Sequence, residues 1–117
     1  MDNLQANLDT VFHALADPTR RAVLQQLGRR ELAVSELAKP FDMALPSFMK
    51  HIKVLETSGL ISSQKVGRVR TCKIERRNMA AAEGWLEKQR ALWEGRTDRL
   101  AEYAEQLALR ESNDDNT

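Results

Sequence analysis

Apolar residues recur at helical spacing through the first third of the chain and predict three helices. The first covers residues 4–16. The second covers residues 18–27, because Asp17 is a good N-cap and Pro18 suits the first helical position, where its missing N–H costs nothing. The third is short and covers residues 34–41. The chain therefore begins as a helical domain.

A fourth helix, over residues 44–58, has two faces of opposite character. Leu45, Phe48, Ile52 and Leu55 lie on one arc, which we expect to face the core. The opposite arc consists of Pro46, Ser47, Lys50, His51, Lys53, Val54 and Thr57. This arc is cationic and contains no carboxylate, so it suits an anionic partner such as the major groove of DNA. From this stretch alone, an ordinary basic surface helix is an equally good interpretation.

The next segment predicts a β-hairpin, because two β-favouring runs are separated by Gly67-Arg68. Lys65, Arg68 and Arg70 gather at its tip. On its own, a basic hairpin tip would indicate only solubility. Here it follows a short helix, a turn and a basic helix, which together predict a helix-turn-helix. A cationic hairpin in that position is a wing that reaches adjacent phosphates or a minor groove.

The last third of the chain predicts one long helix over about residues 78–110. An apolar seam repeats every seven residues at Met79, Leu86, Trp93, Leu100 and Leu107. A helix of this length cannot bury its whole seam on so small a domain, so we expect a second copy to cover it. Packing against the first helix is the alternative for part of the seam. The predicted dimer contacts are Leu4, Leu8, Leu86, Trp93, Leu100 and Leu107.

Composition and charge sharpen this picture. The 117 residues suffice for one domain, which we place at residues 1–110, followed by a disordered acidic tail over residues 111–117. The net charge of +1 hides a strong asymmetry: residues 44–77 hold eight Lys or Arg against two Asp or Glu, whereas residues 78–117 hold five against nine. Positive charge therefore follows the predicted helix-turn-helix and wing. With no signal peptide and no membrane-spanning run, the protein is expected to be cytoplasmic.

Other chemistry is weakly indicated. His13 and His51 lie on separate helices without a nearby Cys or paired carboxylate at ligand spacing, so we predict no metal and no cofactor. Neither a nucleophile turn nor a glycine-rich phosphate loop is present, so we predict no catalytic residue and no enzyme. Cys72 is expected to be a small buried residue on a strand. Arg20 and Arg21 stand in the first turn of a helix, where the dipole disfavours cations; we expect Asp17 or a phosphate to compensate, with bracing through carboxylates favoured.

Four ordered blocks, FHALADPTRRAVLQQL, ELAVSELAKPF, ALPSFMKHIKVLETSGLI and KVGRVRTCKI, resemble the ArsR family of dimeric bacterial winged-helix repressors. The resemblance implies a dimer that binds an operator and responds to a signal, and it is nearest to a non-metal branch with a Trp-containing C-terminal helix. Residues 32–36 lack the cysteine pair of the family's thiolate metal site. Ala44 and Met49 stand where the family often has serines. The residues that match the family's basic stretch and wing arginines are Lys50, His51, Arg68 and Arg70.

The overall prediction is a mostly α fold with a small β-hairpin: a winged helix-turn-helix with long N- and C-terminal dimerisation helices. The helix-turn-helix covers about residues 34–58 and the wing about residues 60–75. The predicted DNA contacts are Ser47, Lys50, His51, Lys53, Lys65, Arg68 and Arg70. The predicted function is a homodimeric, sequence-specific transcriptional repressor on a pseudo-palindromic operator, controlled by a small organic ligand, a protein partner or simple abundance. The alternative is a winged-helix module that binds only proteins.

Overall fold

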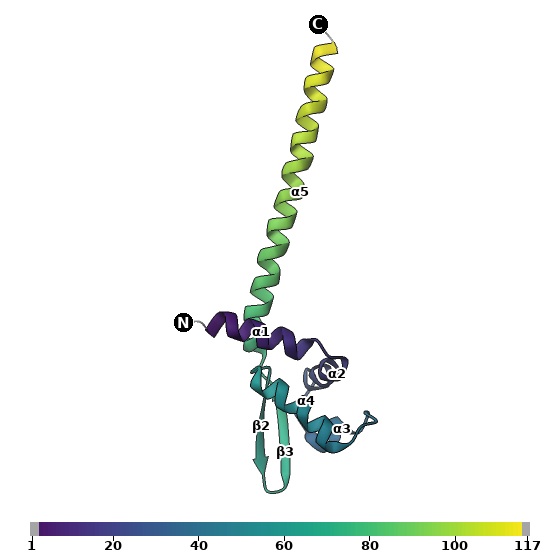
Figure 1. The fold of residues 1–117 in the computed structure, drawn as a ribbon, viewed down its shortest axis with the longest axis vertical. Coiled ribbons are helices and arrows are strands. Elements are labelled where there is room, and N and C mark those ends of the chain that lie inside the picture. The colour runs from purple at the N-terminus through teal and green to yellow at the C-terminus, as the bar shows by residue number, and fades with distance from the viewer. Residues whose placement is uncertain (1–2, 116–117) are drawn as a thin grey trace. The chain divides into compact units, whose positions relative to one another are not determined.

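The computed structural model describes the backbone of residues 3–115 and, within it, the side chains of residues 8–96 and 98–113 (Figure 1). The chain divides into two compact units, Met1–Ala82 and Glu83–Thr117, where the sequence predicts one domain over residues 1–110. In chain order the elements are α1 (Asn3–Leu15), α2 (Pro18–Leu27), β1 (Leu32–Ala33), α3 (Val34–Ala38), α4 (Leu45–Thr57), β2 (Ile61–Val66), β3 (Val69–Ile74), the 3-10 helix η1 (Arg76–Met79) and α5 (Ala80–Asp115). The predicted mostly α fold with a β-hairpin wing is confirmed.

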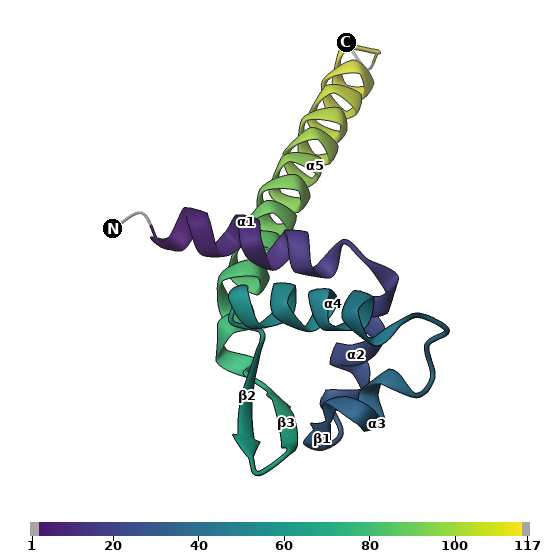
Figure 2. The same cartoon turned by 60° about the horizontal axis from the view of Figure 1, so that its bottom comes forward.

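Helix α4 is the centre of the first unit, where it lies against α1, α2 and β2 (Figure 2). Phe48, Ile52 and Leu55 are fully buried, as their common arc predicts. Leu45 is the exception, with 57% of its surface exposed, because it is the first residue of the helix and the core packs against the middle of the helix. On the opposite arc, Ser47, Lys50 and Lys53 are exposed, whereas Val54 is partly buried against the core.

The sheet has three strands in the order β1-β3-β2, all antiparallel. Strands β2 and β3 form the predicted hairpin, which we call the wing, and Val66 pairs with Val69 around the two-residue turn. Gly67 has φ +64°, whereas no described residue other than glycine has a positive φ. Glycine at the first turn position and an ordinary residue at the second are typical of a type II′ hairpin turn. The prediction omitted β1, which pairs Leu32 with Cys72.

Two predicted boundaries are corrected. Helix α3 ends at Ala38 rather than residue 41, because Pro40 has no N–H with which to continue the helical ladder. Helix α5 continues through Asp115, although disorder is predicted from residue 111. Residues 111–115 contain neither proline nor glycine, so nothing in this segment stops the helix. Residues 116–117 of the predicted tail lie outside the described residues.

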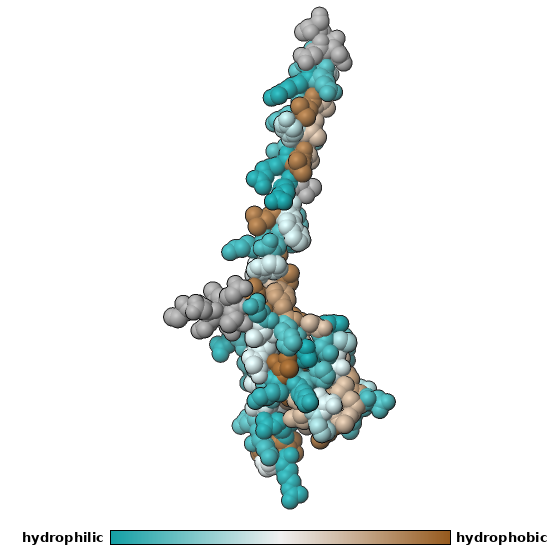
Figure 3. Space-filling view, viewed as in Figure 1, coloured by the Kyte–Doolittle hydropathy of each residue, from teal (hydrophilic) through white to brown (hydrophobic). Residues whose placement is uncertain are grey.

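Helix α5 carries apolar side chains along its length (brown in Figure 3). In the single chain, Leu86, Trp93, Leu100 and Leu107 are between 40% and 65% exposed. None of the helices in the described part of the chain combines the length and the apolar character needed to cross a bilayer.

Candidate nucleic-acid interface

The outward arc of α4 presents three of the predicted DNA contacts. Ser47, Lys50 and Lys53 are exposed, because the three fully buried residues of this helix fix the orientation of its other side. Among the described residues, neither lysine has an ion-pair partner. Ala44, at the N-cap, offers no side-chain acceptor to the first N–H groups of the helix. The exposed arc of α4 therefore keeps the positive charge of its lysines, and the first turn of the helix keeps the positive end of the helix dipole.

The inner face of the wing carries two further cations. Lys65 and Arg70 are directly opposite each other in the β2–β3 ladder, an arrangement of like charges that destabilises a hairpin by itself. Nearer the core, the same face is occupied by Ile61 and Cys72, which are buried. An anion bound at the tip would relieve the repulsion between the two cations.

Arg70 is held by a chain of hydrogen bonds that joins the wing to α4. Its Nη1 donates to Ser63 Oγ at 2.9 Å, and Ser63 Oγ donates to Glu56 Oε1 at 3.0 Å. Glu56 is near the end of α4, so its carboxylate fixes Arg70 through one intervening hydroxyl. Neither Glu56 nor Ser63 is among the predicted site residues. Alternation along the strands places Ser63 on the same face as Arg70, diagonal to it, and this was the available signal.

Wing, α3 and α4 together enclose a hollow of about 280 Å³, which we call the cationic hollow. It is lined by Ala33, Val34, Ser35, Met49, Lys65, Arg68, Val69 and Arg70. The structure thus brings together the three predicted wing cations beside Met49 of α4. None of these lining residues is acidic. A hollow of this composition suits a phosphate group.

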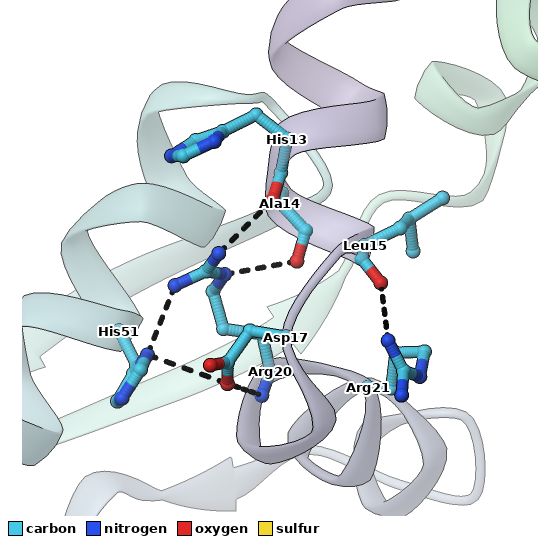
Figure 4. A network of polar contacts seen from close by, with 7 residues as sticks. All are labelled: His13, Ala14, Leu15, Asp17, Arg20, Arg21 and His51. Atoms are coloured by element: carbon cyan, nitrogen blue, oxygen red, sulfur yellow. Dashed lines mark hydrogen bonds and ion pairs between the residues drawn. The ribbon is translucent and has the colours of Figure 1, made fainter.

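His51 differs from the other predicted contacts on α4, because the structure gives it partners within the chain (Figure 4). Its Nδ1 lies 3.0 Å from Arg20 Nη1 and 3.7 Å from Asp17 Oδ2. Its side chain is 22% exposed. The pattern on α4 placed His51 correctly on the polar arc but could not show that α2 lies beside it.

The guanidinium groups of Arg20 and Arg21 bond to main-chain carbonyls rather than to the carboxylates that the sequence favoured. Arg20 donates from Nε to Ala14 O at 2.9 Å and from Nη2 to His13 O at 3.0 Å, and Arg21 donates from Nη1 to Leu15 O at 2.8 Å (Figure 4). The last carbonyls of a helix have no partner within it and carry negative dipole charge. The two arginines at the start of α2 therefore satisfy the end of α1.

Asp17 supports the same corner as the predicted N-cap of α2. Its Oδ2 accepts the backbone N–H of Arg20 at 3.1 Å. Burial acts to raise the pKa of Asp17, but this hydrogen bond and the nearby His51 and Arg20 side chains outweigh it, so the pKa lies below its ordinary value. Asp17 is therefore a carboxylate at neutral pH.

Cys72 is fully buried, as predicted. Burial and the Glu56 carboxylate raise the pKa of its thiol, and Arg70 opposes them. A buried, protonated thiol is a poor metal ligand and a poor nucleophile. Within the described residues, no three His, Cys, Asp or Glu side chains gather in a way that would hold a metal ion.

The predicted dimer residues lie on two helices. Four of them, Leu86, Trp93, Leu100 and Leu107, are exposed along α5. Leu8 is half-buried in α1. Leu4 belongs to α1, but its side chain lies outside the described part of the chain.

Comparison with known proteins agrees with this architecture. A family model described as a helix-turn-helix domain matches residues 15–64. The HTH-type transcriptional regulator Rv2034 of Mycobacterium tuberculosis (strain ATCC 25618 / H37Rv) is 37% identical over 73 residues, 62% of this chain and 68% of that protein. The transcriptional repressor SdpR of Bacillus subtilis (strain 168) is 31% identical over 61 residues, 52% of this chain and 68% of that protein. A crystal structure of the ArsR family transcriptional regulator RHA00566 is 62% identical, with a TM-score of 0.74 over 77% of this chain and 93% of that chain.

Proposed function

The chain belongs to the ArsR family of winged helix-turn-helix transcriptional regulators, and on this premise we propose that it is a homodimeric repressor of a pseudo-palindromic operator. The observation that carries the proposal is the gathering of cations on one arc of α4 and at the tip of the wing. The related protein SdpR is named a transcriptional repressor, which supports repression rather than activation. The exposed apolar residues of α5 support the dimer.

In the proposed complex, α4 enters the major groove. Ser47 and Lys50 lie in the first half of the exposed arc and contact base edges, while Lys53 contacts the backbone. The wing contacts the backbone beside the groove, where Arg68 and the cationic hollow receive phosphate oxygens. Two copies related by a two-fold axis place two such helices on half-sites about one helical turn, or a multiple of it, apart.

We also propose that the signal is not a thiolate-bound metal. Soft metal ions are held by several sulfurs, whereas this chain has one cysteine, which is buried on β3. Regulation then falls to a small organic ligand, a protein partner or abundance. The test is a DNA titration of the parent and Cys72→Ser, with and without zinc, cadmium or arsenite. Metal-induced release in the parent that disappears in the variant would overturn this part of the proposal.

Binding measurements on Lys50→Ala and Arg68→Ala test the DNA proposal. The binding site is first selected from random duplexes, and each variant is then titrated with the selected and a scrambled duplex over a range of salt. Lys50→Ala is expected to lose about 1–3 kcal/mol of discrimination between the two duplexes. Arg68→Ala is expected to weaken both complexes alike and to reduce the salt slope by about 1, because it removes one phosphate contact. Salt-insensitive binding by the parent would instead favour a protein-interaction module.

A further inference from the structure

We infer that Arg20 fixes His51 in the neutral tautomer that carries its proton on Nε2, and thereby makes the histidine of the recognition helix a hydrogen-bond donor toward DNA. This inference rests on the proposed function, because it assumes that α4 faces DNA. It names Arg20 as a positioning residue and His51 as a residue that selects what the helix reads.

The first step is the chemistry of the contact between the two side chains. A guanidinium is protonated throughout the range in which proteins fold, so each of its nitrogens can only donate. The 3.0 Å contact from Arg20 Nη1 to His51 Nδ1 is therefore a hydrogen bond in which Nδ1 accepts through its lone pair. An imidazole that accepts at Nδ1 and is neutral carries its proton on Nε2.

The donor, the guanidinium of Arg20, is held rigidly in place. Arg20 is buried, and its Nε and Nη2 are already bound to the carbonyls of Ala14 and His13 at the end of α1. These two bonds leave Nη1 directed at His51 (Figure 4). The guanidinium cannot turn away without giving up its bonds to the carbonyls of Ala14 and His13, which opposes rotation even though His13 O also accepts the N–H of Ala16 at 3.2 Å.

The nearby carboxylate of Asp17 does not set the tautomer of His51. Asp17 Oδ2 is 3.7 Å from Nδ1, beyond hydrogen-bond distance, and it accepts the backbone N–H of Arg20 instead. A protonated Nδ1 could donate to this carboxylate only if Arg20 Nη1 moved away from it. The groups around Nδ1 therefore favour the tautomer in which this nitrogen is unprotonated.

The Nε2 side of the His51 ring is the side available to DNA in the proposed complex. Nε2 lies on the side of the imidazole that points away from Arg20 and Asp17 (Figure 4), and the side chain is 22% exposed. An Nε2–H group can approach a phosphate oxygen, a purine N7 or guanine O6, all of which are acceptors. It cannot pair with the amino groups of adenine or cytosine, which are donors. His51 therefore selects for an acceptor at its position in the groove.

Two substitutions distinguish the roles of the two ring nitrogens of His51. In His51→Asn, an amide oxygen can replace Nδ1 as the acceptor for Arg20, but nothing replaces Nε2–H. In His51→Gln, an amide N–H can replace Nε2–H, but Nδ1 is lost. We expect His51→Asn to keep the thermal stability of the parent and to bind the selected duplex about 5- to 150-fold more weakly, and His51→Gln to bind within a few fold of the parent with a lower Tm. Equal losses of affinity in both variants, or parental affinity in His51→Asn, would overturn the inference.

Nitrogen-15 NMR of the imidazole gives a readout that a merely structural role of Arg20 would not move. In the parent protein at mildly alkaline pH, the proton is expected on Nε2 and Nδ1 is expected to show the chemical shift of an unprotonated nitrogen. Arg20→Lys is expected to shift the ring toward a mixture of tautomers; should this variant fail to fold, the parent spectrum still decides. A parent spectrum with the proton on Nδ1 contradicts the inference even when DNA binding is intact.

Modified duplexes identify the acceptor on the DNA. A methylphosphonate at the contacted position removes a charged phosphate oxygen, 7-deazaguanine and 7-deazaadenine remove the purine N7, and 2-aminopurine in place of guanine removes O6. The modification that weakens binding by the parent but not by His51→Asn identifies the acceptor. If no modification in the site has this effect, the DNA part of the inference is overturned. If the parent shows no salt-dependent DNA binding at all, the proposed function fails, while the tautomer measured by NMR stands or falls separately.

Discussion

Arg20 joins three segments at a single corner: its guanidinium closes the end of α1, contacts His51 of α4, and projects from the first turn of α2. The sequence shows that the first turn of α2 is cationic but not which acceptors surround it, because those acceptors are main-chain carbonyls without a sequence signature. The candidate residues on the exposed arc of α4 were therefore predictable from periodicity, whereas the partners of His51 were not.

Asp17 offers a prediction at this scale. Asp17→Ala should lower the free energy of unfolding by about 1 kcal/mol at pH 7, because it removes the N-cap of α2. Asp17→Asn is the matched control, since asparagine caps equally well, and should remain closer to the parent. Urea denaturation of the three proteins measures both differences.

The pH dependence of the stability difference between the parent and Asp17→Ala follows from the direction of the Asp17 pKa shift. The pKa of Asp17 is below its ordinary value of 3.8 in the folded protein, so the unfolded chain takes up the proton first. Its ionised form therefore contributes stability that is present above that value and is lost as the pH falls through the folded pKa. The difference between parent and Asp17→Ala should shrink in acid; a difference that grows there would contradict this account.

At the level of elements, local patterns predicted what depends on local sequence. The bounds of α2, α4 and the hairpin follow from an N-cap, a proline and a Gly67 turn, all of which act over a few residues. Strand β1 was missed because two residues have no period and gain their pairing only from β3, far along the chain. The wing cations were predicted, but the cationic hollow required the packing of α3 and α4 against the wing.

Ser63 provides a prediction for the junction of wing and helix. Ser63→Ala should weaken DNA binding by about 2- to 5-fold, because Arg70 loses a bond of roughly 0.5–1 kcal/mol that holds it in place. The salt slope should stay unchanged, because the cation is still present. Fluorescence anisotropy over a range of salt measures both quantities.

Ser62→Ala is the matched control for this junction. Ser62 lies on the other face of β2 and donates to Glu75 Oε1 at 3.1 Å, so its removal deletes a similar bond away from the hollow. We expect parental DNA affinity in this variant. If the two alanine variants weaken binding equally, the bond from Arg70 to Ser63 has no special part in DNA binding.

At the level of the whole molecule, the exposed apolar residues of α5 support the proposed dimer. Leu100 is 65% exposed in the single chain, so an aspartate there would be harmless to a monomer. In a dimer the same change places a charge in the seam and costs several kcal/mol. We therefore expect Leu100→Asp to be monomeric at micromolar concentration by sedimentation velocity, whereas the parent is dimeric.

Ala91→Asp is the control for that prediction. Ala91 is exposed on the same helix but does not belong to the seven-residue repeat, so this variant should remain dimeric. A monomeric parent, or monomers in both variants, would show that the seam of α5 does not hold the dimer together.

The central claim is that two copies grip one duplex through paired α4 helices and wings, and a hydroxyl-radical footprint on the selected duplex tests it most directly. The account predicts two protected patches on each strand, related by a two-fold axis, with their centres about one helical turn or a multiple apart. The protection should be lost in Leu100→Asp and kept in Ala91→Asp. A single asymmetric patch, or uniform protection that does not depend on sequence, would contradict the account.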